Sequence, residues 1–374
     1  MKNIKKETMK YDWLIVGSGI FGSTFAHLAK ASGQRCLVID KRCHLGGNLY
    51  CENKDGIIVH RYGAHIFHTS NKMIWDFVNR QVELVPYKHS PIAFYKGHYY
   101  SLPFNLLTFC KLWGDMSPIQ AKEKLDYQRL KNINAKNLEE QAISLVGKDI
   151  YSKLIKGYTE KQWGRDCKEL PSFIIKRIPL RFTFDNNYFD DIYQGIPKGG
   201  YNLLIESLLD GIETKLNVDF IKEKNVFSKI SKRILYTGSI DEYFDYRLGA
   251  LQYRSIRFED KEYETDNYQG CSVINYTDRA IQYTRSIEHR HFDRYCKSKN
   301  KTIVSNEYSQ EWEVGIEPYY PINNERNDNL FHKYEILANN EKNTIFGGRL
   351  GSYKYYDMDD AIEAAILLYN QIYK

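Results

Sequence analysis

The stretch YDWLIVGSGIFGSTFAHLAKASGQRCLVID, residues 11–40, limits the folds open to this chain more than any other feature. The apolar run from Trp13 to Val16 predicts a short buried strand, and Arg35 to Ile39 predict a second strand that ends at Asp40. Between them, the residues from about Ile20 to Ala31 predict a helix. Strand, helix and strand in this order predict an α/β fold that contains a parallel sheet.

Three glycines and one acid give this unit a predicted ligand. Gly17, Gly19 and Gly22 follow the first strand with G-x-G-x-x-G spacing. The first permits a tight turn, the second lets a pyrophosphate approach the backbone, and the third packs helix against strand. The helix N-terminus offers free N–H groups to phosphate, and Asp40 can hold ribose hydroxyls. The spacing alone is weak, but with both strands, the helix and the acid it predicts a dinucleotide site.

Two glycine pairs favour FAD over NAD. Gly46-Gly47 follow the acid closely and suggest a second close approach to a long cofactor, although an ordinary turn would use the same residues. Near the other end, Gly347-Gly348 follow the strand-like NTIF. Asp357 is then placed to cap a helix whose apolar residues, from Met358 onward, have helical spacing. A nucleotide domain closed by its own C-terminal helix is typical of flavoproteins.

Two further units are predicted in the middle of the chain. Residues 104–170 have helical spacing, and residues 240–320 resemble strands. We therefore predict a Rossmann-like FAD-binding domain built from discontinuous segments, with an inserted helical domain and an antiparallel β-sheet domain. The predicted boundaries are 1–85, 196–240 and 340–374 for the FAD-binding domain, 100–180 for the helical domain with a mobile lid at about 160–178, and 86–99, 181–195 and 241–339 for the sheet domain.

Composition narrows the classes of partner. The chain has 374 residues and a net charge of +6 without a basic block, which fits anionic small molecules and argues against a nucleic-acid partner. Its 31 tyrosines suit sugar or base binding, or simply replace phenylalanine in strands. Seven scattered cysteines without a C-x-x-C motif indicate reduced thiols in a cytoplasm. No apolar run reaches about 18 residues, so no membrane partner is predicted.

The stretch HRYGAHIFHT, residues 60–69, leaves two interpretations open. His65 and His68 are three residues apart, a spacing that could direct both rings to a metal ion. No Asp or Glu nearby completes a ligand set, so the histidines alone do not favour metal over a structural role. A second polar stretch contains Trp163 and Arg165, is followed by Arg177, and has the composition of a mobile lid. Arginines there could clamp phosphate or simply face solvent.

Taken together, the motifs resemble those of bacterial UDP-galactopyranose mutases along nearly the whole chain. The resemblance is carried by VGSGIFGS, DKRCHLGGN, HRYGAHIFHT, KGYTEKQWG, ELPSFIIKRIPLRFTFDNNYF, YTRSIEH, PYYPI and GGRLGSYKYYDM. It implies an isomerase that interconverts UDP-galactopyranose and UDP-galactofuranose through a covalent adduct between the anomeric carbon and N5 of reduced FAD. It also implies a supply of galactofuranose for cell-surface polysaccharide, a homodimer, and NADH or NADPH as reductant.

The resemblance also assigns roles to residues. Arg177 and Arg285 are expected to grip the diphosphate, with His65 and His68 beside the flavin and the sugar; these four are the expected catalytic residues. The expected substrate-binding residues are Tyr158, which stacks on uracil, Trp163 of the lid, Arg177, Tyr188, Asn275, Arg285, Tyr320 and Tyr355. The expected cofactor-binding residues are Gly17, Gly19, Gly22, Asp40, Lys41, Gly47, Asn48, His65, Arg349, Asp357 and Met358. No metal is expected.

Three positions depart from the family pattern. His89 stands where related enzymes often have asparagine, Gln282 replaces a proline, and Phe184 stands where some relatives carry tyrosine. The sugar therefore stays open, and UDP-N-acetylgalactosamine is an alternative substrate. Two other classes of function are a flavin-dependent oxidase and a nucleotide-binding protein without chemistry.

Overall fold

The N-terminal unit forms as the sequence predicts. In the computed structural model, which describes residues 9–175 and 178–373, β1 spans Tyr11–Val16, α1 spans Ile20–Ala31 and β2 spans Cys36–Ile39. They belong to a five-stranded parallel sheet with the order β10-β2-β1-β11-β17. The other strands come from distant segments: β10 Glu213–Lys215, β11 Ser231–Tyr236 and β17 Thr344–Phe346. The α/β domain is therefore discontinuous in sequence, as predicted.

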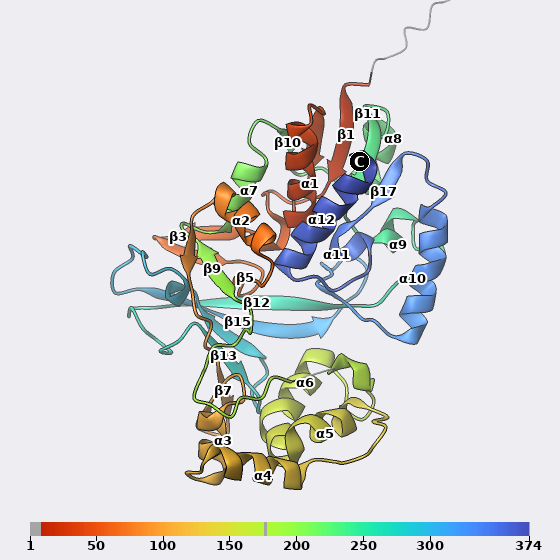
Figure 1. Ribbon diagram of the computed structural model, residues 1–374. Coiled ribbons are helices and arrows are strands. Elements are labelled where there is room, and N and C mark those ends of the chain that lie inside the picture. The colour runs from red at the N-terminus through yellow and green to blue at the C-terminus, as the bar shows by residue number, and fades with distance from the viewer. Residues whose placement is uncertain (1–8, 176–177, 374) are drawn as a thin grey trace, which may run out of the picture.

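Helices cover both faces of this sheet (Figure 1). Trp13 and Ile15 of β1 pack on one face with three helices, α1, α7 Tyr201–Leu208 and α12 Met358–Tyr373. Leu14 packs on the other face with α8 Phe220–Phe227, α9 Ile240–Tyr243 and α10 Glu325–Ala338. A parallel strand buried on both faces is mostly apolar, which explains the apolar run Trp13–Val16 of β1.

A seven-stranded sheet lies below the α/β domain in Figure 1. Its order is β16-β12-β15-β14-β13-β7-β8, and neighbouring strands are antiparallel except β13 and β7, which are parallel. Its strands are β7 Ile92–Tyr95, β8 His98–Ser101, β12 Tyr253–Tyr263, β13 Val273–Tyr276, β14 Arg285–Glu288, β15 Thr302–Glu311 and β16 Tyr320–Pro321. The predicted sheet is thus present but mixed at one pair, because β7 comes from an earlier segment of the chain.

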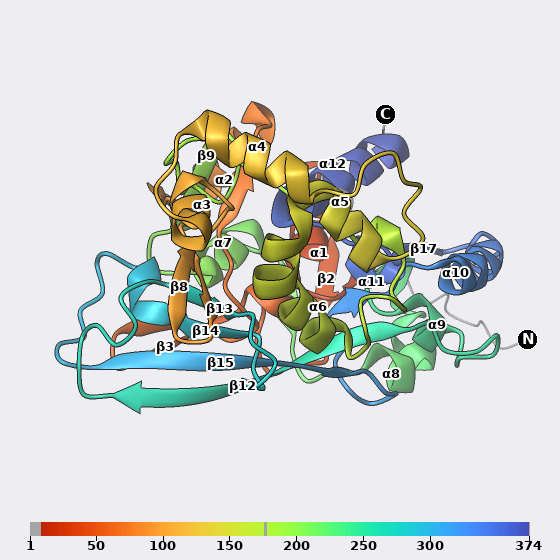
Figure 2. The same cartoon turned by 90° about the horizontal axis from the view of Figure 1, so that it is seen from below.

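A helical unit lies on the far side of the seven-stranded sheet (Figures 1 and 2). It consists of α3 Leu106–Trp113, α4 Pro118–Gln128, α5 Leu138–Ile150, the π-helical turn η2 Tyr151–Ile155 and α6 Lys156–Trp163. Asn105, Ser117 and Asn137 cap the first three helices through their side chains. Phe109 and Leu125 are fully buried in its separate core. Among residues 9–175 and 178–373, no helix is long and apolar enough to cross a membrane.

Smaller elements connect these layers, and one of them, β9, differs from the predicted domain boundaries, as does the helix α10. The elements are η1 Gly47–Leu49, β3 Cys51–Lys54, β4 Ile57–His60, β5 Phe67–Thr69, α2 Lys72–Gln81, β6 Leu84–Pro86, η3 Ser172–Ile174, β9 Tyr193–Pro197, η4 His289–Phe292 and α11 Gly348–Gly351. β9 pairs with β5 and β6 in a separate three-stranded sheet, not with the large sheet to which 181–195 were assigned. α10, assigned to the sheet domain, packs on the parallel sheet because its buried Tyr334 joins that core.

Candidate active site

A cavity of about 240 Å³ opens at the carboxyl ends of β1, β2 and β11, where the sequence predicts a dinucleotide. Gly17 has φ of +105°, and a Cβ there would lie 2.1 Å from Thr237 Oγ1; a Cβ on Gly22 would lie 2.1 Å from the carbonyl oxygen of Gly17. Both positions therefore require glycine, Gly17 in the turn after β1 and Gly22 inside α1. Every residue predicted to bind the cofactor lines this cavity: Gly17, Gly19, Gly22, Asp40, Lys41, Gly47, Asn48, His65, Arg349, Asp357 and Met358.

The carboxylate of Asp40 is held in a fixed orientation at the end of β2. Its Oδ2 accepts hydrogen bonds from the amide and the hydroxyl of Ser18, at 2.9 and 2.6 Å, and its Oδ1 accepts one from the amide of Arg42 at 2.9 Å. Across the cavity, Asp357 directly precedes α12 as expected, and its amide donates to the Asp360 carboxylate. Burial raises the pKa of Asp357. A glycine cradle at a helix start beside an oriented carboxylate fits a dinucleotide.

Two more cavities continue from the first. The second, of about 270 Å³, shares with the first Asn48, His65, Tyr319, Arg349, Asp357 and Met358. Its wall also includes His68 and five predicted substrate residues, Tyr188, Asn275, Arg285, Tyr320 and Tyr355. The third, of about 170 Å³, shares Tyr188 and Asn275 with the second and ends at Tyr158 among apolar side chains of the helical unit. The three cavities thus form one row from the parallel sheet to the helical unit.

Arg285 is a fixed positive charge in the wall of the middle cavity. Its Nε donates to the hydroxyl of Tyr158 at 2.9 Å, and Glu307 lies 3.7 Å away. Burial alone would lower the pKa of Arg285, but Glu307 and the neighbouring tyrosines raise it well above its ordinary value. Burial raises the pKa of Tyr158 to about 12, so the phenol stays neutral. A permanent cation beside a neutral aromatic ring can hold an anionic diphosphate next to a stacked base.

Arg349 brings a second guanidinium to the junction of the first two cavities. Its Nη2 donates to the carbonyl of Tyr356 at 2.6 Å, and its Nη1 donates to that of Tyr319 at 3.3 Å. The guanidinium lies 5.7 and 5.3 Å from the ring centroids of Tyr320 and Tyr355, which stack on each other. The cation is therefore oriented by backbone carbonyls and aromatic faces.

The three histidines of HRYGAHIFHT lie in different surroundings. His65 lines both of the first two cavities, and burial, with Arg349 nearby, lowers its pKa to about 4. His68 faces the second cavity, with Nδ1 2.7 Å from Asp191 Oδ2 and its ring stacked 3.7 Å from that of Phe189. His60 is buried behind the loop, where its Nδ1 accepts from the His65 amide at 3.2 Å. Within the described residues, no three metal-ligand side chains gather around one point.

His60 is the first member of a buried hydrogen-bonded chain. The His60 amide donates to His289 Nδ1 at 3.2 Å, and His289 Nε2 lies 2.7 Å from Ser305 Oγ. The Ser305 hydroxyl donates to Asp260 Oδ1 at 2.7 Å. Since His289 Nδ1 accepts, its Nε2 carries the proton and donates a hydrogen bond to Ser305. The donors of the chain therefore all point from His60 toward Asp260. The loop that carries His65 is thereby tied to β12 and β15.

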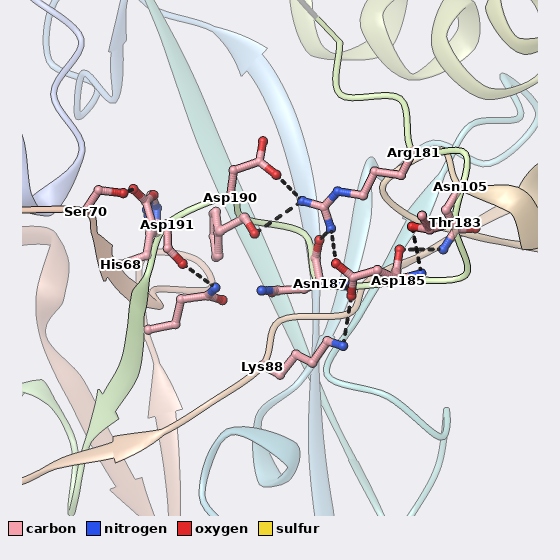
Figure 3. Close-up of polar contacts among 12 residues, drawn as sticks. His68, Ser70, Lys88, Asn105, Arg181, Thr183, Asp185, Asn187, Asp190 and Asp191 are labelled. Carbon is pink, nitrogen blue, oxygen red and sulfur yellow. Dashed lines mark hydrogen bonds and ion pairs between the residues drawn. The ribbon is translucent and has the colours of Figure 1, made fainter.

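The segment 181–191 supplies one wall of the middle cavity, and Arg181 organises it (Figure 3). Arg181 donates to the carbonyls of Asn187 and Phe189 and pairs with the carboxylates of Asp185 and Asp190. The Asp191 carboxylate that holds His68 also accepts from Ser70 at 2.6 Å. Sequence reasoning missed these contacts. The acids that follow Arg181 in RFTFDNNYFDD were the only signal of them.

The departures from the family pattern differ in their surroundings. Phe184 and Gln282 are exposed, whereas His89 is 7% exposed and lines the middle cavity between Phe189 and Tyr188. Burial, with Arg285 nearby, lowers the pKa of His89 to about 3, and its Nδ1 has no hydrogen-bond partner within the described part of the chain. His89 is therefore the departure placed to affect a ligand.

One predicted residue that the structure describes is not brought to these cavities. Trp163 ends α6 and packs, half-buried, against the core of the helical unit; it is not part of the wall of the three cavities. Arg177 lies outside the described residues. The roles of both stay predictions.

Comparison with known proteins decides the family. The family model for UDP-galactopyranose mutase matches residues 153–355, and a dTDP-fucopyranose mutase of Escherichia coli is 40% identical over 362 residues, covering 94% of this chain and 96% of the relative. The chain belongs to the UDP-galactopyranose mutase family. A relative named "Probable UDP-galactopyranose mutase", from Klebsiella pneumoniae, is 39% identical over 94% of this chain and 92% of its own length. A UDP-galactopyranose mutase of Mycoplasma genitalium is 34% identical over 95% and 93%.

The structural comparisons agree on the mutase fold. A structure of reduced UDP-galactopyranose mutase superposes with a TM-score of 0.73 at 13% identity, covering 97% of this chain and 95% of that one. Putrescine oxidase superposes with a TM-score of 0.57 at 11% identity, over 97% and 99%. Residues 15–81 also match the family model of an NAD(P)-binding Rossmann-like domain. The predicted family, α/β fold and enzyme class are confirmed: the chain is a sugar mutase of an isomerase family, which implies a flavin cofactor.

Proposed function

We propose that this enzyme interconverts UDP-galactopyranose and UDP-galactofuranose, with reduced FAD in the first cavity and the nucleotide sugar across the second and third. The single observation that carries the proposal is the row of three connected cavities with Arg285 in the middle one. A nucleotide sugar carries its charge between its base and its sugar, and Arg285 lies in the second cavity beside Tyr158 of the third. The proposed product is galactofuranose for cell-surface polysaccharide.

The cofactor fits the first cavity by the shape of its backbone. Gly17 and Gly22 leave a cradle that a side chain would fill, and Asp40 is oriented for ribose hydroxyls. When bound, reduced FAD supplies N5 as the nucleophile for the anomeric carbon of the sugar. The protein then needs no nucleophile of its own. The proposed reductant is NADH or NADPH.

On the substrate side, this chain's residues bind, orient and stabilise charge. Tyr158 is proposed to stack on uracil, and Arg285 to hold the diphosphate and stabilise it as it leaves the sugar. Arg177 is proposed as the second diphosphate arginine and Trp163 as a lid residue. Asn275, Tyr188, Tyr320 and Tyr355 are proposed to line the diphosphate and the sugar.

His65 and His68 are proposed to act between cofactor and sugar. His65 lines both cavities and is neutral at pH 7, because burial lowers its pKa to about 4. A neutral imidazole can donate one hydrogen bond and accept another without adding charge. Asp191 fixes the ring of His68, which selects its tautomer. Both residues therefore orient ligand groups in this proposal.

A second candidate substrate is a dTDP-linked 6-deoxyhexose, because one relative at 40% identity is a dTDP-fucopyranose mutase. Fucose is 6-deoxygalactose, so the two sugars differ by one hydroxyl at C6. His89 lines the middle cavity and differs from the asparagine that related enzymes often have, so we propose it as the residue that tells the two sugars apart. UDP-N-acetylgalactosamine and an oxidase activity stay as further alternatives.

One assay tests these functions together. The purified yellow protein is reduced with dithionite, given UDP-galactofuranose, dTDP-fucofuranose or UDP-N-acetylgalactosamine in its furanose form, and the pyranose product is measured by chromatography. We expect turnover of UDP-galactofuranose by the reduced protein alone, and a lower kcat/KM for the other two sugars. A higher kcat/KM for dTDP-fucofuranose would overturn the galactose assignment. Turnover when oxidised, with hydrogen peroxide release, would favour an oxidase.

The assembly and location of the enzyme are also proposals. We propose a cytoplasmic homodimer that acts on soluble nucleotide sugars and has no nucleic-acid or membrane partner. Light scattering of the purified protein tests the dimer directly.

A further inference from the structure

The side chain of Lys161 on α6 ends inside a cage of backbone carbonyls. Its Nζ lies 2.7 Å from the carbonyl oxygen of Tyr276, 3.0 Å from that of Asp278, and 2.9 Å from those of Ile281 and Tyr283. All four oxygens come from the segment 276–283, which joins β13 to β14. An ammonium group has three N–H donors, so the four acceptors exceed its donors by one and every N–H has a partner. Rings of backbone carbonyls are also the ligands that replace water around a monovalent metal cation.

The caged nitrogen is charged at neutral pH. Burial lowers the pKa of Lys161 to about 8, and the nearby Asp278 carboxylate opposes this change. At pH 7 the ammonium form therefore predominates. A neutral amine has two N–H donors and would leave at least two of the four carbonyls unpaired.

Two other residues of α6 contact the same segment. A Cβ on Gly157 would lie 2.3 Å from the carbonyl oxygen of Thr277, so the helix backbone rests directly on the segment. The Glu160 carboxylate pairs with Arg279 at 3.0 Å. Gly157 and Lys161 are four residues apart and thus share one helix face. Backbone contact, ion pair and caged ammonium together dock α6 on the segment 276–283.

This docking determines where two substrate-side residues lie. Tyr158 follows Gly157 on α6, and Arg285 is the first residue of β14, after the segment. Their side chains meet, because Arg285 Nε donates to the Tyr158 hydroxyl at 2.9 Å. A shift of α6 would move Tyr158 away from the cavity that it shares with Asn275. The cage itself lines none of the three cavities.

We infer that the segment 276–283 is a monovalent-cation site that the chain fills with its own ammonium, and that Lys161 is a positioning residue for the base end of the substrate cavities. The inference relies on the proposed function only for the identity of the substrate. The cation class follows from the ligands, four neutral backbone carbonyls, which suit K⁺ or an alkylammonium.

The test is truncation and chemical rescue of Lys161. In the flavin-loaded enzyme, Lys161→Ala should lower kcat/KM for UDP-galactofuranose about 100-fold, mainly through KM, as expected for lost charge-assisted hydrogen bonds. The flavin absorbance should not change. Propylammonium or K⁺ should restore kcat/KM to at least about a tenth of the wild-type value. Tetramethylammonium, which has no N–H and is larger than K⁺, should not restore it. Lys148→Ala, an exposed lysine of α5, is the matched control and should behave as wild type.

Binding of UDP, followed by tryptophan fluorescence, separates this inference from the proposed function. Weaker UDP binding by Lys161→Ala that K⁺ or propylammonium restores supports the cation site even if the wild type shows no mutase activity. Normal UDP affinity and normal turnover in Lys161→Ala would overturn the positioning role, and a defect that no cation restores would overturn the cation site. If Lys161→Ala fails to fold, Gly157→Ala tests the docking separately. It should raise KM while flavin binding persists, and an unchanged KM would again overturn the docking.

Discussion

The two ends of the cleft are built by different means. The cofactor end uses backbone at the start of α1 and the ends of parallel strands, with glycines where side chains would intrude. The substrate end uses side chains from separate loops and from three layers of the molecule, held by Arg181, Asp191, Lys161 and the chain that ends at Asp260. A substitution that moves the backbone of the cofactor end should abolish flavin binding as a whole. A substitution at the substrate end removes one side-chain contact at a time, so we expect graded losses of activity there.

The largest effect is expected at the cofactor end, from Gly22→Val. A Cβ at this position lies 2.1 Å from the carbonyl oxygen of Gly17, so α1 must move away from β1. Forcing a side chain into this packed contact costs about 3 kcal/mol of stability. The movement of α1 also breaks the cradle. We expect loss of nearly all bound flavin, measured as the ratio of absorbance at the flavin band to that of protein, together with a lower Tm.

Gly19→Ala is the matched control for that variant. A Cβ on Gly19 meets no atom within 4 Å in the protein itself, so the fold should be kept. If the cofactor pyrophosphate approaches this residue, the added methyl group should lower flavin affinity. The Tm of the flavin-free protein should stay at the wild-type value. Normal flavin affinity in Gly19→Ala would show that the cofactor does not approach the backbone there.

The next effect in size is expected at the substrate end, from Arg285→Ala. Removal of the fixed cation should lower kcat by roughly 10³-fold, because charge on the departing diphosphate is no longer stabilised. Flavin content should be that of the wild type, since Arg285 does not line the first cavity. Arg257→Ala, an exposed arginine of β12 in the same sheet, is the control and should retain full kcat. Near-normal kcat in Arg285→Ala would contradict the diphosphate assignment.

The same division explains what could be predicted from the sequence. The cofactor end was predictable because its signals are local: β1, α1 and β2 appear at the predicted residues, and all the predicted cofactor residues line one cavity. The substrate end depends on residues far apart in sequence. The carboxylate of Asp191 meets His68 across 123 positions, and no periodicity marks such a pair. Residues 325–338 were assigned to the sheet domain together with their neighbours, because no local pattern tells which sheet buries Tyr334.

A smaller effect should follow when His68 loses the residue that orients it. Asp191→Ala removes the acceptor for His68 Nδ1, so the ring can take the other tautomer or rotate. We expect kcat to fall about tenfold with little change in flavin content, measured in the same furanose-to-pyranose assay. Ser70→Ala removes only the second hydrogen bond to the same carboxylate and should change kcat less than about twofold. Equal losses in the two variants would mean that Asp191 acts on the loop as a whole.

The last effect concerns the pH dependence of stability, which reports on the buried hydrogen-bonded chain behind His65. Burial lowers the pKa of His289 to about 3, whereas the unfolded side chain titrates near its ordinary value of 6.5. The unfolded state therefore binds more protons than the folded state between these values. Stability from this group is complete above pH 6.5 and is lost as the pH falls, by up to about 1.4 kcal/mol per pH unit.

His289→Asn keeps an acceptor for the His60 amide but cannot titrate. It should be less stable than wild type at pH 7.5, because the bond to Ser305 is lost. Its free energy of unfolding should nevertheless fall less steeply between pH 6.5 and 5, as measured by urea denaturation of the flavin-loaded protein at each pH. His98→Asn, at an exposed position, should keep the wild-type slope. Because His60, His65 and His89 are also held neutral by burial, the slope should decrease but not vanish. An unchanged slope in His289→Asn would mean that the chain opens and admits protons before the protein unfolds.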